Sequence, residues 1–168
     1  MEKMSSYKKL EKEAVSDGIK KFVVGAVVVN ESKVLLLERP KDDFMGGIFE
    51  LPSGNLESGE TLEEGLFREL EEETGLVIKR IVSYIGHFDY LSGSGKKARQ
   101  FNFLVEVNNF DKIKLTEHDS FVWADIREVH KYKVTDAVKN IIKDCYNTQK
   151  IKMKEVWDNK EDEFWNDL

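Results

Sequence analysis

The segment that most constrains this chain is GNLESGETLEEGLFRELEEETGL, residues 54–76, which crowds eight glutamates around one basic residue. Thr61 and Glu64 have the spacing of a capping box, which predicts that a helix begins near Leu62. Gly75 is placed to cap the C-terminal end of that helix. The segment is therefore expected to form a short and strongly acidic helix.

Carboxylates occupy part of the side that a surface helix normally buries. At about 100° per residue, one stripe of this helix holds Leu62, Gly65, Leu66, Glu69 and Glu73, with Glu72 at its edge. The first half of the stripe is apolar, as expected for a buried face, but the second half is acidic. The other glutamates fit an ordinary solvated face, since they lie off the stripe or near the N-terminus, where the helix dipole favours them: Glu63, Glu64 and Glu71.

The acidic half of the stripe needs a positive partner. Glu69, Glu72 and Glu73 repel one another at spacings of three and four residues, near the negative end of the helix dipole. Arg68 supplies a single charge and is expected to point elsewhere. A hard divalent cation takes oxygen ligands, and magnesium usually shares its coordination sphere with substrate phosphates. This pattern predicts a carboxylate helix that binds a metal ion and, through it, phosphate.

The rest of the chain alternates strands with few helices. Strands are expected at 21–30 and 33–40 around a tight turn, and a short strand in 46–54 is expected to close at Pro52, Ser53 and Gly54. Further strands are expected at 76–91, 98–110 and 120–126, and an amphipathic helix at 135–146. This order predicts an α/β (α+β) domain with a mixed sheet covered by helices on two faces.

Length, charge and cysteine content narrow the class of protein. The 168 residues suffice for one domain, and a net charge of −6 argues against binding of a nucleic-acid polymer. One cysteine excludes an internal disulfide, and the N-terminal segment has no apolar core of a signal peptide. The longest apolar run is too short to span a membrane. We therefore expect a cytoplasmic protein without membrane contact.

The acidic segment resembles the Nudix box, G-x5-E-x7-R-E-U-x-E-E-x-G-U, where U is a bulky apolar residue. All nine specified positions are filled, by Gly54, Glu60, Arg68, Glu69, Leu70, Glu72, Glu73, Gly75 and Leu76. The resemblance implies the family's α/β/α sandwich over about residues 21–145. It also implies hydrolysis of a nucleoside diphosphate linked to another group, with Mg²⁺ as cofactor and Mn²⁺ as a substitute.

The resemblance also assigns roles by motif position. Glu69, Glu72 and Glu73 would ligate the metal, and Glu69 is often the general base. Gly54 would approach the metal through its carbonyl group, and Gly75 keeps its motif position. Glu60 and Arg68 would form an ion pair that braces the loop before the helix. Many members read Trp-x-x-Pro-Gly-Gly before the box, whereas this chain has Phe49 and Ser53 there, which changes the expected substrate contacts.

Five residues outside the box are further candidates. Glu117 lies in a loop where related enzymes often carry an extra ligand or base, and the alternative is an ordinary loop acid. Arg39 ends a strand and could bind phosphate, and Phe49 is a candidate substrate contact. Thr135 and Asp136 begin the last helix, where free N–H groups and side-chain oxygens could contact the base. Simple N-capping is the alternative for Thr135.

The substrate is inferred by elimination. The resemblance places an ADP-ribose signature proline about sixteen residues after the box, yet residues 76–120 contain none. A coenzyme A signature is also absent. The resemblance therefore favours a MutT-type nucleoside triphosphate pyrophosphatase, with oxidised purine nucleotides among its candidate substrates. The alternatives are an ADP-ribose or nucleotide-sugar pyrophosphatase, a non-catalytic nucleotide-sensing module, and an interaction protein.

The chain is expected to divide into three parts. Residues 1–20 form an N-terminal extension, 21–146 the hydrolase domain and 147–168 a C-terminal extension that is expected to be helical. The C-terminal extension carries Trp157, Phe164 and Trp165, which are costly to leave in water. We expect it to pack on the domain or on a second subunit, so a homodimer is one of the expected states.

Overall fold

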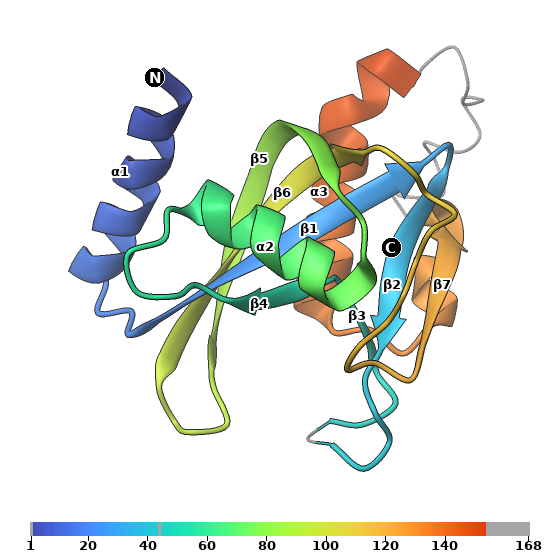
Figure 1. Ribbon diagram of the computed structural model, residues 1–168, viewed down its shortest axis with the longest axis horizontal. Coiled ribbons are helices and arrows are strands. Elements are labelled where there is room, and N and C mark those ends of the chain that lie inside the picture. The colour runs from blue at the N-terminus through green and yellow to red at the C-terminus, as the bar shows by residue number, and fades with distance from the viewer. Residues whose placement is uncertain (1, 44, 154–168) are drawn as a thin grey trace.

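The computed structural model describes residues 2–43 and 45–153 (Figure 1). The elements, in order, are α1 (Glu2–Ser16), β1 (Lys21–Asn30), β2 (Lys33–Glu38), β3 (Phe49–Glu50), β4 (Ser53–Asn55), α2 (Leu62–Thr74), β5 (Ile78–Leu91), β6 (Lys97–Val107), β7 (Ser120–Asp125), the 3₁₀ helix η1 (Ile126–Lys131) and α3 (Asp136–Met153). No helix within these two ranges is long and apolar enough to cross a membrane. The aromatic residues expected to anchor the C-terminal extension lie outside the described residues.

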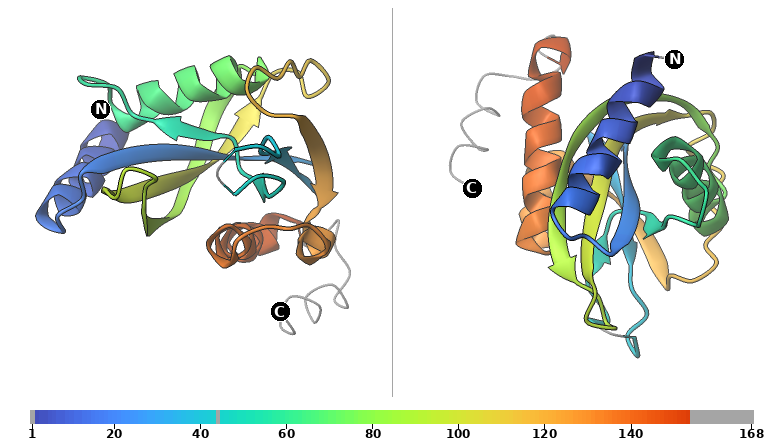
Figure 2. Two further views of the ribbon diagram at one scale, coloured as in Figure 1. Left: turned by 90° about the horizontal axis from the view of Figure 1, so that it is seen from below. Right: turned by 90° about the vertical axis from the view of Figure 1, so that its left-hand side faces the viewer.

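The strands form one mixed sheet, which confirms the expected fold class. Its main order is β3-β2-β1-β6-β5, with β4 paired to β1 and β7 paired to β2. The central pair β1 and β6 is parallel, and every other pairing is antiparallel. Helix α2 covers one face of the sheet and α3 covers the other, which makes the α/β/α sandwich (Figure 2).

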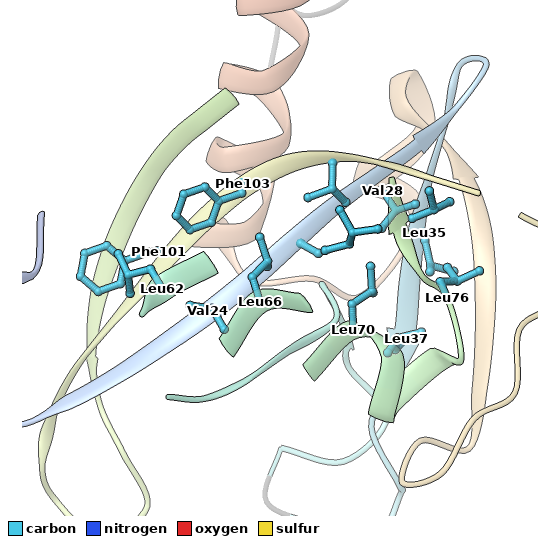
Figure 3. Packing of buried hydrophobic residues seen from close by; sticks show 14 of the residues in the cluster. Val24, Val28, Leu35, Leu37, Leu62, Leu66, Leu70, Leu76, Phe101 and Phe103 are labelled. Carbon is cyan, nitrogen blue, oxygen red and sulfur yellow. The ribbon is translucent and has the colours of Figure 1, made fainter. Parts of the chain in front are cut away.

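The two faces of the sheet carry separate hydrophobic cores, because successive side chains of a strand point to opposite sides. In β1, Val24, Ala26 and Val28 belong to the core beneath α2, whereas Val27 belongs to the core beneath α3. The apolar side of α2 packs through Leu62, Leu66 and Leu70 onto the first core (Figure 3). Burial of this side fixes which side chains of α2 can face the neighbouring strands.

Helix α3 continues to Met153, past the boundary expected at residue 146, and the short helix η1 was not expected. Two parts before α2 also differ from expectation. Ser53 and Gly54 were expected to close a strand, but they lie in the separate strand β4, where they pair with Gly25 and Val24 of β1. Residues 2–16, expected only as an extension, form the helix α1. Its Tyr7, Leu10 and Ala14 pack on the core beneath α2, and their spacing of three and four residues was an unused helix signal.

Candidate functional site

Helix α2 begins and ends where its sequence predicts. The Thr61 hydroxyl accepts a hydrogen bond from the Glu64 N–H at 3.1 Å, and the Glu64 carboxylate accepts one from the Thr61 N–H at 3.3 Å. Gly75 adopts a left-handed φ of 76° and donates its N–H to the Glu71 carbonyl at 2.8 Å. These caps orient the acidic C-terminal half of α2 relative to strand β4.

The acidic stripe is buried to different degrees along its length. The buried residues of α2 are Leu62, Gly65, Leu66, Leu70, Glu73 and Thr74. The Glu69 side chain is 15% exposed, and that of Glu72 is 60% exposed. Glu73, at 7% exposure, is therefore the one carboxylate of the three that is fully within the protein.

Arg68 lies close to the carboxylates, which corrects the expectation that it points elsewhere. It binds Glu60 through Nε at 2.7 Å and Nη2 at 2.9 Å, and Nη2 also reaches the Asn55 carbonyl at 3.0 Å. Its Nη1 donates to both Glu69 and Glu72 at 3.0 Å. All five guanidinium N–H groups thus have acceptors. The bonds to Glu60 lower the pKa of that carboxyl and, with those to Glu69, raise the pKa of Arg68.

Strand β4 lies directly against the acidic part of α2. A Cβ atom at Gly54 would lie 2.0 Å from the Glu69 carboxylate carbon, so only glycine leaves room for that side chain. The Ser53 N–H donates to Glu73 Oε2 at 3.2 Å. The backbone of β4 therefore forms one wall of the carboxylate group.

Glu73 is buried among other acids. Its pKa is raised to about 9, first by burial and then by the negative charge of Glu69, with smaller contributions from Glu50 and Glu117. The N–H bond from Ser53 opposes this rise. Burial also raises the pKa of Glu69, although Arg68 opposes it. Four carboxylates from α2, β3 and the loop before β7 are thus within electrostatic range of one another.

The loop that carries Glu117 is fixed to the C-terminal end of α2. The Lys114 N–H donates to the Thr74 carbonyl at 2.8 Å, and the Thr116 hydroxyl donates to the Glu72 carbonyl at 3.1 Å. These bonds use helix carbonyls that have no partner within the helix. They bring Glu117, a sequence candidate, toward the acids of α2.

A second group anchors the same loop to β3. His118 Nε2 lies 2.9 Å from Glu50 Oε1, and its side chain is 8% exposed. Arg39 contacts Glu50 and Asp43, each at 3.3 Å, so this candidate lies at the edge of the acidic group. Sequence reasoning missed Glu50, although a charged residue between apolar neighbours just before the acidic segment was a usable signal.

Three sequence candidates lie on the other side of the sheet. Phe49 packs with the core beneath α3, and its ring makes an edge-on contact with Tyr132 at a centroid distance of 5.3 Å. Thr135 caps α3, since its hydroxyl accepts from the Val138 N–H at 3.3 Å. Asp136, the first residue of α3, is exposed. The structure gives none of these three a contact with the α2 carboxylates.

The carboxylate and carbonyl oxygens suit a hard divalent cation, although the carboxylate side chains do not all point to one position. Within the described residues, no three metal-ligating side chains already form a metal-binding group. Arg68 holds Glu69 and Glu72, but no described cation contacts Glu73. A buried carboxylate without a cationic partner is costly. The residues that would hold a metal ion are Glu69, Glu72, Glu73, Glu117 and the Gly54 carbonyl.

Comparison with known proteins agrees with this geometry. Residues 20–145 match the NUDIX domain family. An ADP-ribose pyrophosphatase from Methanocaldococcus jannaschii is 29% identical over 119 residues, which cover 59% of this chain and 69% of that protein. A CTP pyrophosphohydrolase from Escherichia coli K12 is 28% identical over 116 residues, covering 68% of this chain and 83% of that protein.

Solved structures of similar fold indicate the same family. A NUDIX hydrolase from Nitrosomonas europaea superimposes with a TM-score of 0.65 and 27% identity, covering 76% of this chain and 89% of that one. The family match spans most of the chain and contains the whole carboxylate group. The chain therefore belongs to the Nudix family, whose members are generally divalent-metal-dependent hydrolases of pyrophosphate bonds.

Proposed function

We propose that this Nudix hydrolase is a nucleoside triphosphate pyrophosphatase that releases a nucleoside monophosphate and pyrophosphate. The observation that carries the proposal is the group formed by Glu69, Glu73, Glu50 and Glu117, in which Glu73 is buried and has no cationic partner among the described residues. Such a group is stabilised by a hard cation that also binds the anionic oxygens of a phosphate chain. We propose magnesium for this role, with manganese as its substitute.

The protein's own groups have separate tasks in this proposal. Glu69, Glu72, Glu73 and Glu117, with the Gly54 carbonyl, hold the metal ion, which when bound neutralises charge on the phosphoryl oxygens and acidifies a water molecule. One carboxylate of the group accepts a proton from the attacking water, and Glu69 and Glu117 are its candidates. Loading the site requires Glu72 to leave Arg68, which its 60% exposure permits.

Two arginines support the proposed metal and phosphate site. Arg39 is 30% exposed, and its ion pairs with Asp43 and Glu50 are both 3.3 Å long, so it is available to a phosphate group. Arg68 and Glu60 hold the loop before α2 through two charge-assisted bonds. Phe49, Thr135 and Asp136 are left as contacts to the nucleoside, on the α3 side of the sheet.

A triphosphate substrate is favoured over ADP-ribose by two observations. Residues 76–120 lack the proline that the resemblance associates with ADP-ribose hydrolysis. The similar E. coli protein is named for CTP, a triphosphate. The name of the M. jannaschii relative supports ADP-ribose as the second candidate.

Product analysis separates the two candidates. The protein is incubated with Mg²⁺ and each of the common and 8-oxo-purine nucleoside triphosphates, ADP-ribose and a nucleotide sugar, and the products are separated by ion exchange. We expect pyrophosphate and a monophosphate from triphosphates at a higher kcat/KM than AMP and ribose phosphate from ADP-ribose. A higher kcat/KM for ADP-ribose would transfer the assignment to the second candidate.

A further inference from the structure

Two buried carboxamides lie together on the α3 face of the sheet, outside the carboxylate group. Gln100 is 6% exposed and Asn102 is 0% exposed, and both belong to β6. Gln100 Nε2 donates to Asn102 Oδ1 at 2.8 Å. A Cβ atom at Gly25 of β1 would lie 2.5 Å from each of these two atoms, so the pair rests directly on a glycine backbone.

The orientation of both amides follows from their hydrogen bonds. Asn102 Nδ2 donates to the Gly86 carbonyl at 3.3 Å and to the Gln100 carbonyl at 3.2 Å. The NH₂ group of Asn102 is thereby occupied, which leaves its oxygen toward Gln100. Gln100 must then present its NH₂ group to Asn102. Asn102 thus fixes which atom of the Gln100 amide is the donor and which is the acceptor.

The Gln100 amide retains unused hydrogen-bonding capacity. Its Oε1 accepts no bond from the described part of the chain, and Nε2 has a second N–H. Gln100 is 6% exposed, and its Oε1 keeps some contact with solvent. A buried polar group in a native structure normally has a partner. One donor and one acceptor side by side form the edge with which glutamine binds a nucleobase.

The amide lies close to the carboxylate group. The Ser53 N–H contacts Glu73, Ser53 pairs with Gly25, and the Gln100 amide covers Gly25. Strands β4 and β6 flank β1 and, at about 4.8 Å per strand spacing, are roughly 10 Å apart within the sheet. Gln100 and α2 lie on opposite faces, so a nucleotide with its phosphates at α2 and its base at Gln100 must pass the edge of the sheet at β4.

Aromatic side chains adjoin the same position. Phe88 of β5 pairs in register with Gln100. The ring of Tyr90, which is 40% exposed, lies 6.1 Å from the Phe88 ring. Burial raises the pKa of Tyr90, and Glu50 raises it further while Arg39 lowers it, which puts this ring within range of the carboxylate side. Aromatic rings of this kind stack on nucleobases.

We propose that Gln100, held by Asn102 over Gly25, binds the base of the substrate through its carboxamide edge and so determines which nucleotides are hydrolysed. This inference rests on the proposed nucleotide substrate and names a new contact for it. Phe88 and Tyr90 form the adjoining aromatic surface. Asp136 at the start of α3 lies on the same face of the sheet and contacts a different part of the nucleoside.

The test measures how the protein ranks the four bases, and not only how fast it hydrolyses one nucleotide. For wild type, Gln100→Met and Gln100→Glu, kcat/KM is measured with ATP, CTP, GTP and UTP, and dissociation constants with their α,β-methylene analogues. Gln100→Met removes both hydrogen bonds at similar size, so the best base should lose about 10- to 100-fold and the four values should converge. Gln100→Glu replaces the free donor by an acceptor and should reorder the four bases.

The control is Asn140→Asp, the same amide-to-acid change at an exposed position of α3, and it should leave the ranking unchanged. Equal losses for all four bases, or no change, would overturn the base contact. If wild type binds the analogues, the Gln100 variants change the ranking of the bases, and no nucleotide is hydrolysed, only the proposed function is overturned. Wild type that neither binds nor hydrolyses any of them would overturn both.

Discussion

The glutamates at the two ends of helix α2 lie in opposite environments. At the N-terminal end, Glu64 completes the capping box, and Glu60, in the loop just before the helix, is bound twice by Arg68. At the C-terminal end, Glu73 is buried, has one backbone N–H as donor and has a pKa raised to about 9. The first group is satisfied by the protein itself, whereas the second needs a ligand. Identical side chains on one helix and on the loop before it thus separate into structural and functional groups by what surrounds them.

The largest effect is expected when one carboxylate of the functional group is removed. Glu73→Gln keeps an oxygen for the Ser53 N–H but removes the charge, so kcat/KM should fall by about 10²- to 10⁴-fold. Melting temperature in chelator should stay equal or rise, because glutamine requires neither a buried charge nor the uptake of a proton on folding. Steady-state kinetics and a thermal melt measure both.

The matched control is Glu71→Gln on the exposed side of the same helix, which should change neither quantity appreciably. A large loss of stability in Glu73→Gln would instead assign that residue to the structural group.

A second change acts on the space beside the acids. In Gly54→Ala the new methyl group would overlap the Glu69 carboxylate, so Glu69 must move. We expect about a 100-fold loss of kcat/KM, with little loss in the free energy of unfolding, because the overlapped atoms are the far end of a flexible side chain. Gly93→Ala, where the added atom meets nothing within 4 Å, is the control for kinetics and denaturant unfolding. Wild-type activity in Gly54→Ala would show that the position of Glu69 is not critical.

A third change loosens the structural group. Arg68→Lys keeps the charge but cannot reproduce the two-point bond to Glu60 or the bond to the Asn55 carbonyl. The free energy of unfolding should fall by about 1–3 kcal/mol, as measured by denaturant unfolding in chelator. Arg80→Lys, at a pair that is 61% and 38% exposed, should have a clearly smaller effect. Equal effects would mean that the Arg68 brace is no stronger than a surface ion pair.

A further test is the pH dependence of the metal-free protein. Because the pKa of Glu73 is raised in the folded state, the folded protein keeps a proton that the unfolded chain has lost. Stability in chelator should therefore fall as pH rises from about 5 to 9. Thermal melts across this range should show a shallower fall in Glu73→Gln than in wild type. Parallel curves would mean that Glu73 is already ionised without metal.

Local signals in the sequence predicted the site better than its surroundings. The caps of α2 and the burial of Glu73 follow from spacing within one helix, so Thr61, Gly75 and the acidic stripe were predictable. The Glu60–Arg68 ion pair was also expected, from the resemblance, and Arg68 and Glu72 are four residues apart on α2. The contacts of Glu50 depend on β3 and the loop before β7 meeting near α2, which spacing along the chain does not encode. The Gln100 pair was missed for the same reason, since it needs Gly25 of another strand beneath it.

The most direct measurement is a magnesium titration followed by melting temperature. If the C-terminal acids of α2 require a cation, Mg²⁺ at about 100 times its dissociation constant should add about 2.7 kcal/mol to the stability of wild type. That corresponds to roughly 5–10 °C for a chain of this size. Glu73→Gln should show only a small part of this shift, and Glu71→Gln should show all of it. A wild-type melting temperature that does not respond to Mg²⁺ or Mn²⁺, or an equal response in Glu73→Gln, would contradict the metal site.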